Sequence, residues 1–385
     1  MQGIVSYIEL PGHPTSGGIV LLLIFAGIYL IRFFFDFFMY GRVVFSNDLR
    51  IKNSKPSFSV ILTVRNEEGN LRDNLPEILT SSYLDFEVIV VDDFSQDQTY
   101  TILGLLREKY KYLHISCLSQ EVHHSSKQAL NVGLKASKND WIILTQPSVR
   151  EFPAEWLSSF AEKINNRKKL VVGYSNVEPE KGAYNLFFRI ESFLQQLKSF
   201  AYLCIGCGYV VEEDNVAFRR QQYFDMGGFA GEMNDEYMNL ERLINKFIKK
   251  RQTALNLSGD GIIRKKQLIT SKKYRELIIK ILRIKKRLGF FRRFLLFVDS
   301  LTALLIIPVS LITLLLLPEA FIIVGAIVAV KAILRMLIIY NALNHLNEQK
   351  IFIPSLFYEL IIPYVRLYFS LYYYRSLRKR KWDNN

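Results

Sequence analysis

The sequence predicts an α/β domain whose sheet is mostly parallel and flanked by helices, with hydrophobic segments before and after it. Two β-rich apolar runs, within residues 59–70 and 88–99, each stop abruptly in acidic and turn-forming residues. Strands without polar alternation are typical of parallel sheets, which are covered on both faces. Ligands bind beyond the carboxyl ends of such strands, so we expect the residues after both runs to share one site.

Helical patterns alternate with these strands. Apolar residues recur at helical spacing in residues 71–79, 99–110 and 126–136, and a third apolar strand is expected at 140–145. This alternation predicts right-handed crossovers between parallel strands. Beyond Pro153 we expect a helix at 154–165, a strand at 169–174, a helix at 184–203, a strand at 215–220, a turn at Gly227 and Gly228, and a helix at 235–249.

The N-terminal hydrophobic segment, residues 17–40, has about the 20 residues that a membrane-spanning helix needs. No Lys or Arg precedes it, whereas basic residues follow from Arg42 onward. The positive-inside rule then predicts an external N-terminus and a cytosolic middle region. Arg32 and Asp36 allow two interpretations, an intramembrane ion pair on a lipid path or snorkelling side chains that pair locally near the interface.

The C-terminal hydrophobic region predicts a membrane hairpin from residues 298–317 and 320–343. Residues 351–374 are apolar and aromatic but contain Pro363 and Glu359 and lead into a basic tail, so we expect an interfacial helix there. The predicted organisation is an N-terminal segment with its membrane helix (1–45), a cytosolic domain (55–270), a basic amphipathic interfacial region (271–295), and a C-terminal hairpin with an interfacial helix and basic tail (296–385).

The formal net charge of +14 fits membrane lipids better than nucleic acid, because the basic residues concentrate in residues 272–293 and at the C-terminus, beside the hydrophobic segments. No nucleic-acid-binding module is recognisable, so we expect no nucleic-acid partner.

Three cysteines do not make a disulfide framework, and the pair Cys204 and Cys207 lacks the further ligands of a zinc site.

Several motifs occur together in a fixed order. They are Ser59-Val-Ile61 followed by Arg65-Asn-Glu67, Val90-Val-Asp-Asp-Phe-Ser-Gln-Asp-Gln-Thr99, Ser126-Lys-Gln-Ala-Leu-Asn-Val-Gly-Leu-Lys-Ala136, Asp140-Trp-Ile-Ile-Leu-Thr145, Pro153-Ala-Glu-Trp-Leu157, Asn215-Val-Ala-Phe-Arg219, Gly227-Gly-Phe229 and Asp235-Glu236. In this order they resemble the bacterial membrane-bound family 2 glycosyltransferases, over about residues 56–293. The resemblance implies a GT-A fold and an inverting transfer of a sugar from a nucleotide-diphosphate donor to a lipid-linked or other membrane-proximal glycan acceptor.

The same resemblance implies a multi-pass protein of the bacterial inner membrane, with its catalytic-type domain in the cytosol and a role in making a cell-envelope glycan. A partner glycosyltransferase or an envelope-assembly protein is a further expectation.

The resemblance also assigns site residues. Thr63, Arg65, Asn66 and Glu67 would form the first loop around the nucleotide, Asp92 and Asp93 would accept hydrogen bonds from the base or ribose, Lys127 would meet the diphosphate, and Asp235 or Glu236 would be the catalytic base. Each has a structural alternative: a helix start for residues 66–68, a solvated turn for the Asp pair, a surface lysine, and acidic residues in a helix's first turn.

The sequence departs from the family where an Asp-x-Asp motif usually holds Mg²⁺ or Mn²⁺ after the third strand. Gln146, Pro147 and Ser148 stand there and carry no charge. We therefore assign no metal ligand and expect the chemistry not to depend on a metal in the ordinary way. The Gln-x-x-Arg-Trp motif of processive members is also absent, with Ser271-Lys-Lys-Tyr-Arg275 in that region.

Three functions remain open from the sequence. The first is an active transferase in which Arg65, Lys127, Arg150 or the basic region from Arg264 onward neutralises the departing diphosphate. The second is a catalytically inactive homologue that acts as a membrane-tethered binding or scaffolding subunit. The third is a purely structural membrane protein without a ligand.

Overall fold

The computed structural model describes residues 16–44, 55–120, 125–230, 240–249, 251–348 and 350–382. The chain forms two compact units. The first, called the α/β unit below, comprises residues 46–288 and 344–351, and the second, called the helical unit, comprises residues 1–45, 289–343 and 352–385.

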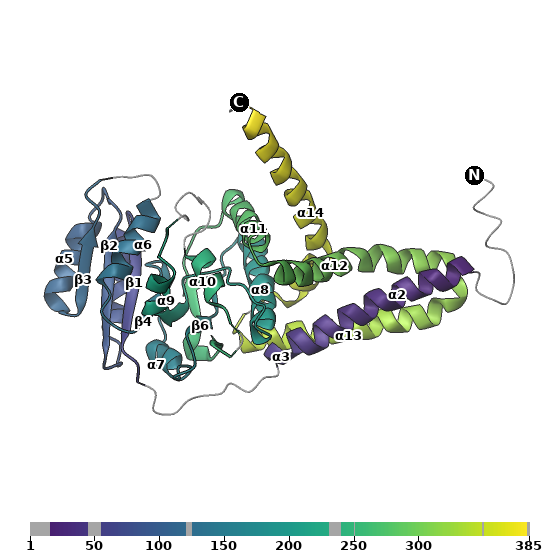
Figure 1. Cartoon of the computed structure of the whole chain (residues 1–385), viewed down its shortest axis with the longest axis horizontal. Helices are drawn as coiled ribbons and strands as arrows, with labels where there is room; N and C mark the ends of the chain where they lie inside the picture. The colour runs from purple at the N-terminus through teal and green to yellow at the C-terminus, as the bar shows by residue number, and fades with distance from the viewer. Residues whose placement is uncertain are drawn as a thin grey trace. The chain divides into compact units, whose positions relative to one another are not determined.

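A seven-stranded sheet forms the centre of the α/β unit, in the order β3-β2-β1-β4-β8-β6-β9 (Figure 1). The strands are β1 (Phe58–Val64), β2 (Phe86–Asp92), β3 (Leu113–Cys117), β4 (Trp141–Leu144), β6 (Leu170–Gly173), β8 (Val216–Arg219) and β9 (Thr253–Asn256). Only β8 runs antiparallel to its neighbours, so the prediction of a mostly parallel sheet is confirmed. Strand β3 and the reversal at β8 were not predicted.

A small second sheet, β5-β10-β7, lies in the same unit. It contains β5 (Val149–Arg150), β7 (Ser175–Val177) and β10 (Ile263–Lys265). Strand β10 pairs antiparallel with β5 and parallel with β7, which brings the chain after residue 262 beside the segment that follows β4.

The helices of the α/β unit follow the predicted alternation. They are α4 (Glu68–Leu79), α5 (Thr99–Lys109), α6 (Ser125–Ala136), α7 (Trp156–Ala161), α8 (Ala183–Cys204), α9 (Arg220–Asp225), α10 (Glu241–Phe247) and α11 (Ser271–Lys286). The helix expected at 154–165 is shorter than predicted. Of the helix expected at 235–249, the described part begins at Glu241, and residues 235–239 lie outside the described residues.

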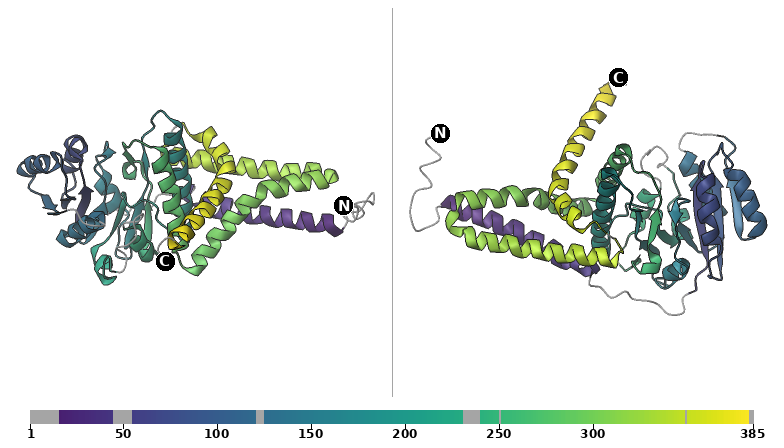
Figure 2. Two further views of the ribbon diagram at one scale, coloured as in Figure 1. Left: turned by 90° about the horizontal axis from the view of Figure 1, so that it is seen from above. Right: turned by 180° about the vertical axis from the view of Figure 1, so that it is seen from behind.

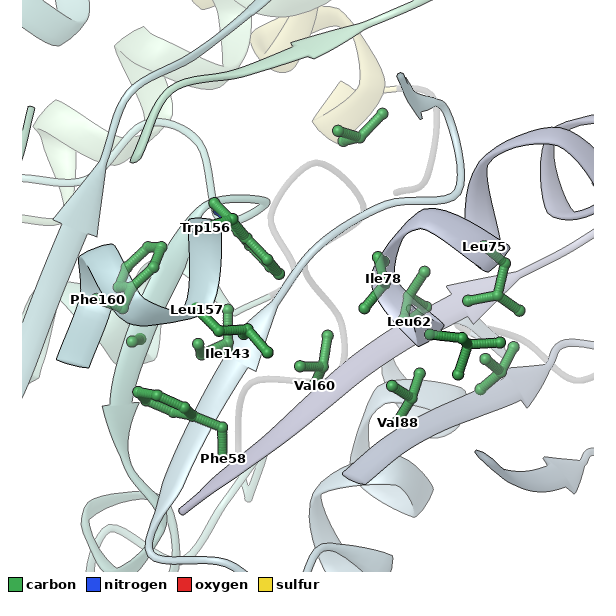
Figure 3. Close-up of a cluster of buried hydrophobic side chains, with 14 of the residues drawn as sticks. Phe58, Val60, Leu62, Leu75, Ile78, Val88, Ile143, Trp156, Leu157 and Phe160 are labelled. Atoms are coloured by element: carbon green, nitrogen blue, oxygen red, sulfur yellow. The ribbon is translucent and has the colours of Figure 1, made fainter. Parts of the chain in front are cut away.

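One face of the sheet packs against α4 and α7 (Figure 3). Leu75 and Ile78 of α4 lie near Leu62, while Trp156 and Phe160 of α7 lie on the side of Phe58 and Ile143. These side chains are almost fully buried. Burying a large apolar side chain contributes about 1.5–3 kcal/mol, so this layer fixes the strands whose ends form the site described below.

Helix α6 packs against β1 and β2 through Ile61 and Val91. The adjacent strand residues Val60, Leu62 and Val90 belong to the core on the other face of the sheet, with α4 and α7. The approach is close at Gly133, where a Cβ atom would lie 2.7 Å from Cγ2 of Ile61 and 3.2 Å from Cγ2 of Val91. A larger residue at position 133 would therefore force Ile61 or the helix to shift.

Segment 344–351 belongs to the α/β unit because Glu348 is buried within it. One carboxylate oxygen lies 2.9 Å from Nη2 of Arg189, and the other lies 3.2 Å from Nη1 of Arg264. The latter oxygen also accepts hydrogen bonds of 2.8 Å from Tyr174 and from Asn176. Two cations and two neutral donors thus satisfy one buried carboxylate.

In its described residues, the helical unit contains four helices that are long and apolar enough to cross a membrane. The first runs through α2 (Ser16–Phe34), a π-helical turn η1 (Phe35–Tyr40) and α3 (Gly41–Val44), and the others are α12 (Phe290–Leu316), α13 (Phe321–His345) and α14 (Phe352–Trp382). The predicted hairpin breaks at the 3₁₀ turn η3 (Pro318–Ala320). Helices α2, α12 and α13 run side by side, whereas α14 leaves them at a steep angle (Figure 2). Whether α14 crosses a membrane or lies in its interface stays a prediction.

A network of buried charges joins the helices of this unit. Arg32 lies 2.6 Å from Asp299 of α12 but 3.8 Å from Asp36, so its close partner is on another helix. Asp36 lies 3.1 Å from Arg335 of α13, which also pairs with Glu359 of α14 at 2.5 Å. Arg32 and Asp36 are both buried, so the interpretation as snorkelling side chains is wrong. Each charge has a partner of opposite sign, as ionisable groups on apolar helices require.

The basic region predicted at 271–295 divides between the two units. Helix α11 is amphipathic, but its apolar residues, including Leu277, Ile281 and Ile284, are buried in the α/β unit. Exposed aromatic side chains instead occupy the start of α12, at Phe290, Phe291, Phe294 and Phe297. Aromatic residues next to arginines are typical of a membrane interface, where this part of the chain is still predicted to lie.

The close approach at Gly133 can be tested by substitution. We expect Gly133→Ala to lower the unfolding temperature of the full-length protein, because overpacking a buried contact costs about 1–3 kcal/mol and exceeds the helix-propensity gain of about 1 kcal/mol. Gly104→Ala on α5 is the matched control, since no atom lies within 4 Å of the added Cβ. It should leave the unfolding temperature unchanged or raise it. Equal stabilisation by both substitutions would contradict the packing described here.

Candidate functional site

A cleft of about 370 Å³ lies at the carboxyl ends of β1 and β4. Residues from four parts of the α/β unit line it: the ends of β1 and β4 with the segments that follow them, the first turns of α6, the segment before β8, and the connection from β10 to α11. The polar lining residues are Thr63, Glu67, Asn70, Ser126, Thr145, Gln146, Ser148, Glu213, Asp214, Lys266, Gln267 and Lys273. The cleft is where the sequence places a ligand site, at the end of parallel strands.

The loop after β1 is tied to the loop after β2. Asn66 has a positive φ of 54°, and its backbone N–H donates to Oγ of Ser95 at 2.9 Å. Its side-chain oxygen accepts from the backbone N–H of Gln96 at 2.7 Å. Helix α4 begins at Glu68, so residues 66–68 do start the helix, although Glu67 makes no capping hydrogen bond. Asn66 therefore has a structural part in shaping this edge of the sheet.

Asp92 and Asp93 are each about 5% exposed, which excludes the alternative of a solvated turn. One oxygen of Asp92 accepts hydrogen bonds from the backbone N–H and the hydroxyl of Ser95. The backbone N–H of Asp93 donates to the carbonyl of Val64 at 2.8 Å, which continues the pairing of β1 and β2. The structure thus places the Asp pair at the predicted strand end, beside the first loop.

Lys127 is 2% exposed, so the alternative of a surface lysine is wrong. It follows Ser126, which lines the cleft, in the first turn of α6. Arg65 is exposed. Of the predicted nucleotide-binding residues, the described cleft wall includes Thr63 and Glu67.

The loop after β4 presents no carboxylate to the cleft. Gln146 and Ser148 are half-buried and line it, with Pro147 buried between them. The carbonyl of Pro147 accepts from the side chain of Asn74 at 2.8 Å, and that of Ser148 accepts from the backbone N–H of Lys266 at 2.8 Å. The loop is therefore held on both sides, and it presents neutral side chains to the cleft.

Asp214 lines the cleft and forms an ion pair with Lys265, and both side chains are buried. Asp214 also accepts a hydrogen bond of 2.7 Å from Ser175, and Lys265 lies 3.4 Å from Glu212. Burial by itself raises the pKa of Asp214, but the ammonium of Lys265 outweighs it and holds that pKa below its usual value. The pKa of Lys265 is correspondingly raised: burial alone lowers it, and Asp214 and Glu212 more than compensate.

The expected base residues, Asp235 and Glu236, lie outside the described residues. The chain resumes at Leu240, whose N–H donates to Glu213 at 2.6 Å. Glu241 then pairs with Lys280 of α11 at 2.5 Å. Leu240 is thus held beside the cleft, since Glu213 lines it.

Sequence reasoning missed Glu213, Asp214, Lys266 and Lys273 as cleft residues. The acidic run at 212–214 directly before a predicted strand was an available signal, because an acid at a strand start is uncommon. The two lysines were not singled out, although they belong to the basic region from Arg264 onward that was one of the predicted sources of charge for the departing diphosphate.

Comparison with known proteins identifies this unit. The family model for glycosyl transferase family 2 matches residues 59–227. This part of the α/β unit is therefore similar to glycosyl transferase family 2. The segment after residue 227, which includes the basic lining residues of the cleft, lies beyond the matched region.

Curated relatives match about a third of the chain. An uncharacterised glycosyltransferase of Rickettsia bellii is 26% identical over 143 residues, which are 36% of this chain and 20% of that protein. The poly-beta-1,6-N-acetyl-D-glucosamine synthase of Staphylococcus epidermidis is 25% identical over 123 residues, 31% of this chain and 29% of that protein. The matches thus span less than a third of either relative's length.

A solved structure shares the fold over most of the chain. It is the mannosyltransferase PcManGT from Pyrobaculum calidifontis in complex with GDP-Man and Mn²⁺, with a TM-score of 0.53 and 16% sequence identity. The alignment covers 89% of this chain and 97% of that one. At this identity the likeness concerns the fold, which is GT-A.

The ion pair between Asp214 and Lys265 predicts a specific pattern of stability. Removing one partner leaves an uncompensated buried charge, so Asp214→Leu or Lys265→Met alone should cost about 3–5 kcal/mol of unfolding free energy. The double variant should be less destabilised than the sum. Because the pKa of Asp214 is depressed in the folded state, its contribution should be present above the ordinary Asp pKa and be lost as the pH falls below it. Denaturant titration at several pH values measures both effects, and additive single substitutions would contradict the pairing.

Proposed function

We propose that this chain transfers a sugar, with inversion, from a nucleotide-diphosphate donor to a lipid-linked or other membrane-proximal acceptor. The observation that carries the proposal is the polar cleft at the carboxyl ends of β1 and β4 of a family 2 domain. Support for a nucleotide-sugar donor comes from the related fold, since PcManGT was solved with GDP-Man.

Each predicted site residue has a role in transfer that follows from its position. Asp92 and Asp93, buried at the end of β2, are fixed acceptors for the nucleoside, and Thr63 and Glu67 form the cleft wall next to them. Asp235 or Glu236 takes the proton of the acceptor hydroxyl. The hydroxyl oxygen bonds to the anomeric carbon as the bond from that carbon to the phosphate oxygen breaks. The electron pair of the broken bond leaves with the nucleoside diphosphate, and attack from the opposite face inverts the configuration.

The donor set of the cleft does not fit the family's divalent cation. Mg²⁺ and Mn²⁺ prefer carboxylate oxygens, but residues 146–148 offer an amide, a proline and a hydroxyl. The three lining carboxylates all have protein partners: Asp214 pairs with Lys265 and Ser175, Glu67 accepts a hydrogen bond of 2.6 Å from Asn70, and Glu213 accepts one of 2.6 Å from the backbone N–H of Leu240. No group of three metal-ligating acids, histidines or cysteines occurs within the described ranges. We therefore propose that transfer does not use the metal-bridged diphosphate of an Asp-x-Asp enzyme.

The helical unit supports a membrane-bound acceptor. Four helices have the length and composition to cross a membrane, and exposed aromatic residues stand at the start of α12. The predicted orientation places the α/β unit in the cytosol, on the inner membrane of a bacterium. A polyprenyl-type carrier could then present its hydroxyl without leaving the bilayer.

The loss of charge at Gln146 and Ser148 also favours a second candidate function. A chain that keeps the fold and the cleft without catalysis would act as a membrane-tethered binding subunit. It would recruit a partner glycosyltransferase or an envelope-assembly protein.

Transfer by the full-length protein tests these alternatives. In bilayers that contain a bacterial lipid extract, we expect transfer of labelled sugar from one of a panel of nucleotide sugars. Asp235→Asn or Glu236→Gln should lower turnover by about 10²-fold or more with donor binding kept, because only the base is removed. Asp93→Asn should weaken donor binding instead.

Donor binding without turnover under every condition would identify the binding subunit. Loss of donor binding in all three variants alike would remove the assignment of the base. Absence of any nucleotide-sugar binding would contradict both candidate functions.

A further inference from the structure

The charge balance of the cleft raises a question that the proposed function leaves open. A nucleotide sugar brings a diphosphate with at least two negative charges, and negative charge grows on the leaving oxygen during transfer. Fixed positive groups are needed where that charge develops. The loop that would hold a cation in the family contributes none, so the compensation must come from another wall of the cleft.

Two lysines form that other wall. Lys266 directly follows β10, and Lys273 stands in the first turn of α11. Because side chains alternate along an extended chain, Lys265 points to Asp214 in the interior while Lys266 is exposed and lines the cleft. The backbone N–H of Lys266 donates to the carbonyl of Ser148, which holds this lysine next to the neutral loop.

Neither ammonium group has a hydrogen-bond or ion-pair partner among the described residues. The acids of the lining have other partners, whereas the side chains of Lys266 and Lys273 form no hydrogen bond or ion pair with a described residue. Burial lowers the pKa of Lys273, and Glu276 and Glu67 oppose this effect while Lys265 adds to it. An anion bound in the cleft would favour the charged form of Lys273.

Two further features face the same space. The hydroxyl of Thr145 is buried, lines the cleft and has no hydrogen-bond partner among the described residues. The start of the 16-residue helix α11 borders the cleft too, since Leu268 and Lys273, on either side of its first residue, both line it. A helix N-terminus favours negative charge. A donor without a partner and a positive helix end both fit a phosphate oxygen.

We propose that the ammonium groups of Lys266 and Lys273 bind the diphosphate of the donor and stabilise the departing nucleoside diphosphate, in place of a divalent cation. The inference rests on the proposed function. When the bond between the anomeric carbon and the phosphate oxygen breaks, the lysines remain protonated and balance the added negative charge. The only proton that moves is that of the acceptor hydroxyl, which goes to the carboxylate base.

Ligand binding to the full-length protein in EDTA tests the proposal. The probes are uridine and guanosine diphosphates, the corresponding nucleosides and inorganic pyrophosphate. Lys266→Gln and Lys273→Gln should each weaken binding of the preferred diphosphate by about tenfold or more, because each removes a charged hydrogen bond. Binding of the nucleoside should change little. Lys266→Arg and Lys273→Arg should restore much of the diphosphate affinity.

Lys272→Gln is the matched control, because Lys272 is an exposed neighbour on the same turn that is not part of the cleft wall. It should leave all affinities unchanged. Diphosphate binding that survives both glutamine substitutions would overturn the inference while leaving the proposed function in place. Equal losses for the nucleoside and the diphosphate would also overturn it, since they would indicate a general disturbance of the cleft. If the wild-type protein binds no nucleotide, the proposed function and the inference both fail.

Discussion

The buried ion pair between Lys265 and Asp214 is the interaction on which the candidate site depends. It joins the end of β10 to the segment before β8, and its carboxylate, Asp214, lines the cleft. The pair occupies Asp214 with an internal cation, which removes this carboxylate as a ligand for any other. It also fixes the strand so that the next residue, Lys266, emerges on the cleft side. The pair therefore neutralises the charges of Asp214 and Lys265 inside the α/β unit, and it leaves the ammonium group of Lys266 facing the cleft.

This charge arrangement reverses that of an Asp-x-Asp site. There, acids hold a cation, and the cation holds the diphosphate. Here the loop at Gln146 and Ser148 is neutral, and two lysines of the connection from β10 to α11 line the same cleft, with Lys266 next to that loop. Electrostatic stabilisation requires fixed positive charge near the leaving oxygen and does not prescribe its source. Under the proposed mechanism, the lysines supply this positive charge in a domain without the Asp-x-Asp motif.

Much of the fold was predictable from the sequence because it follows from local patterns. The runs at β1, β2 and β4 are apolar without alternation, and the glycine pair at 227 and 228 marks a turn with positive φ at both positions. The site was predictable only in part. Asp92 and Lys127 occupy strand and helix ends as expected, but burial, which excluded their surface alternatives, depends on packing from distant segments. The pairs Asp214–Lys265 and Arg32–Asp299 join residues far apart in sequence, and no local pattern reveals them.

The most direct test of the account is donor binding and sugar transfer by the full-length protein in lipid, measured in parallel with Mg²⁺, with Mn²⁺ and with EDTA. If Lys266 and Lys273 take the place of a metal, donor affinity and turnover should each agree within about twofold under all three conditions, well below the tenfold change that 1.4 kcal/mol produces. Turnover that disappears in EDTA and returns with Mn²⁺ would contradict the account, and would show that a divalent cation binds despite the neutral loop at Gln146 and Ser148.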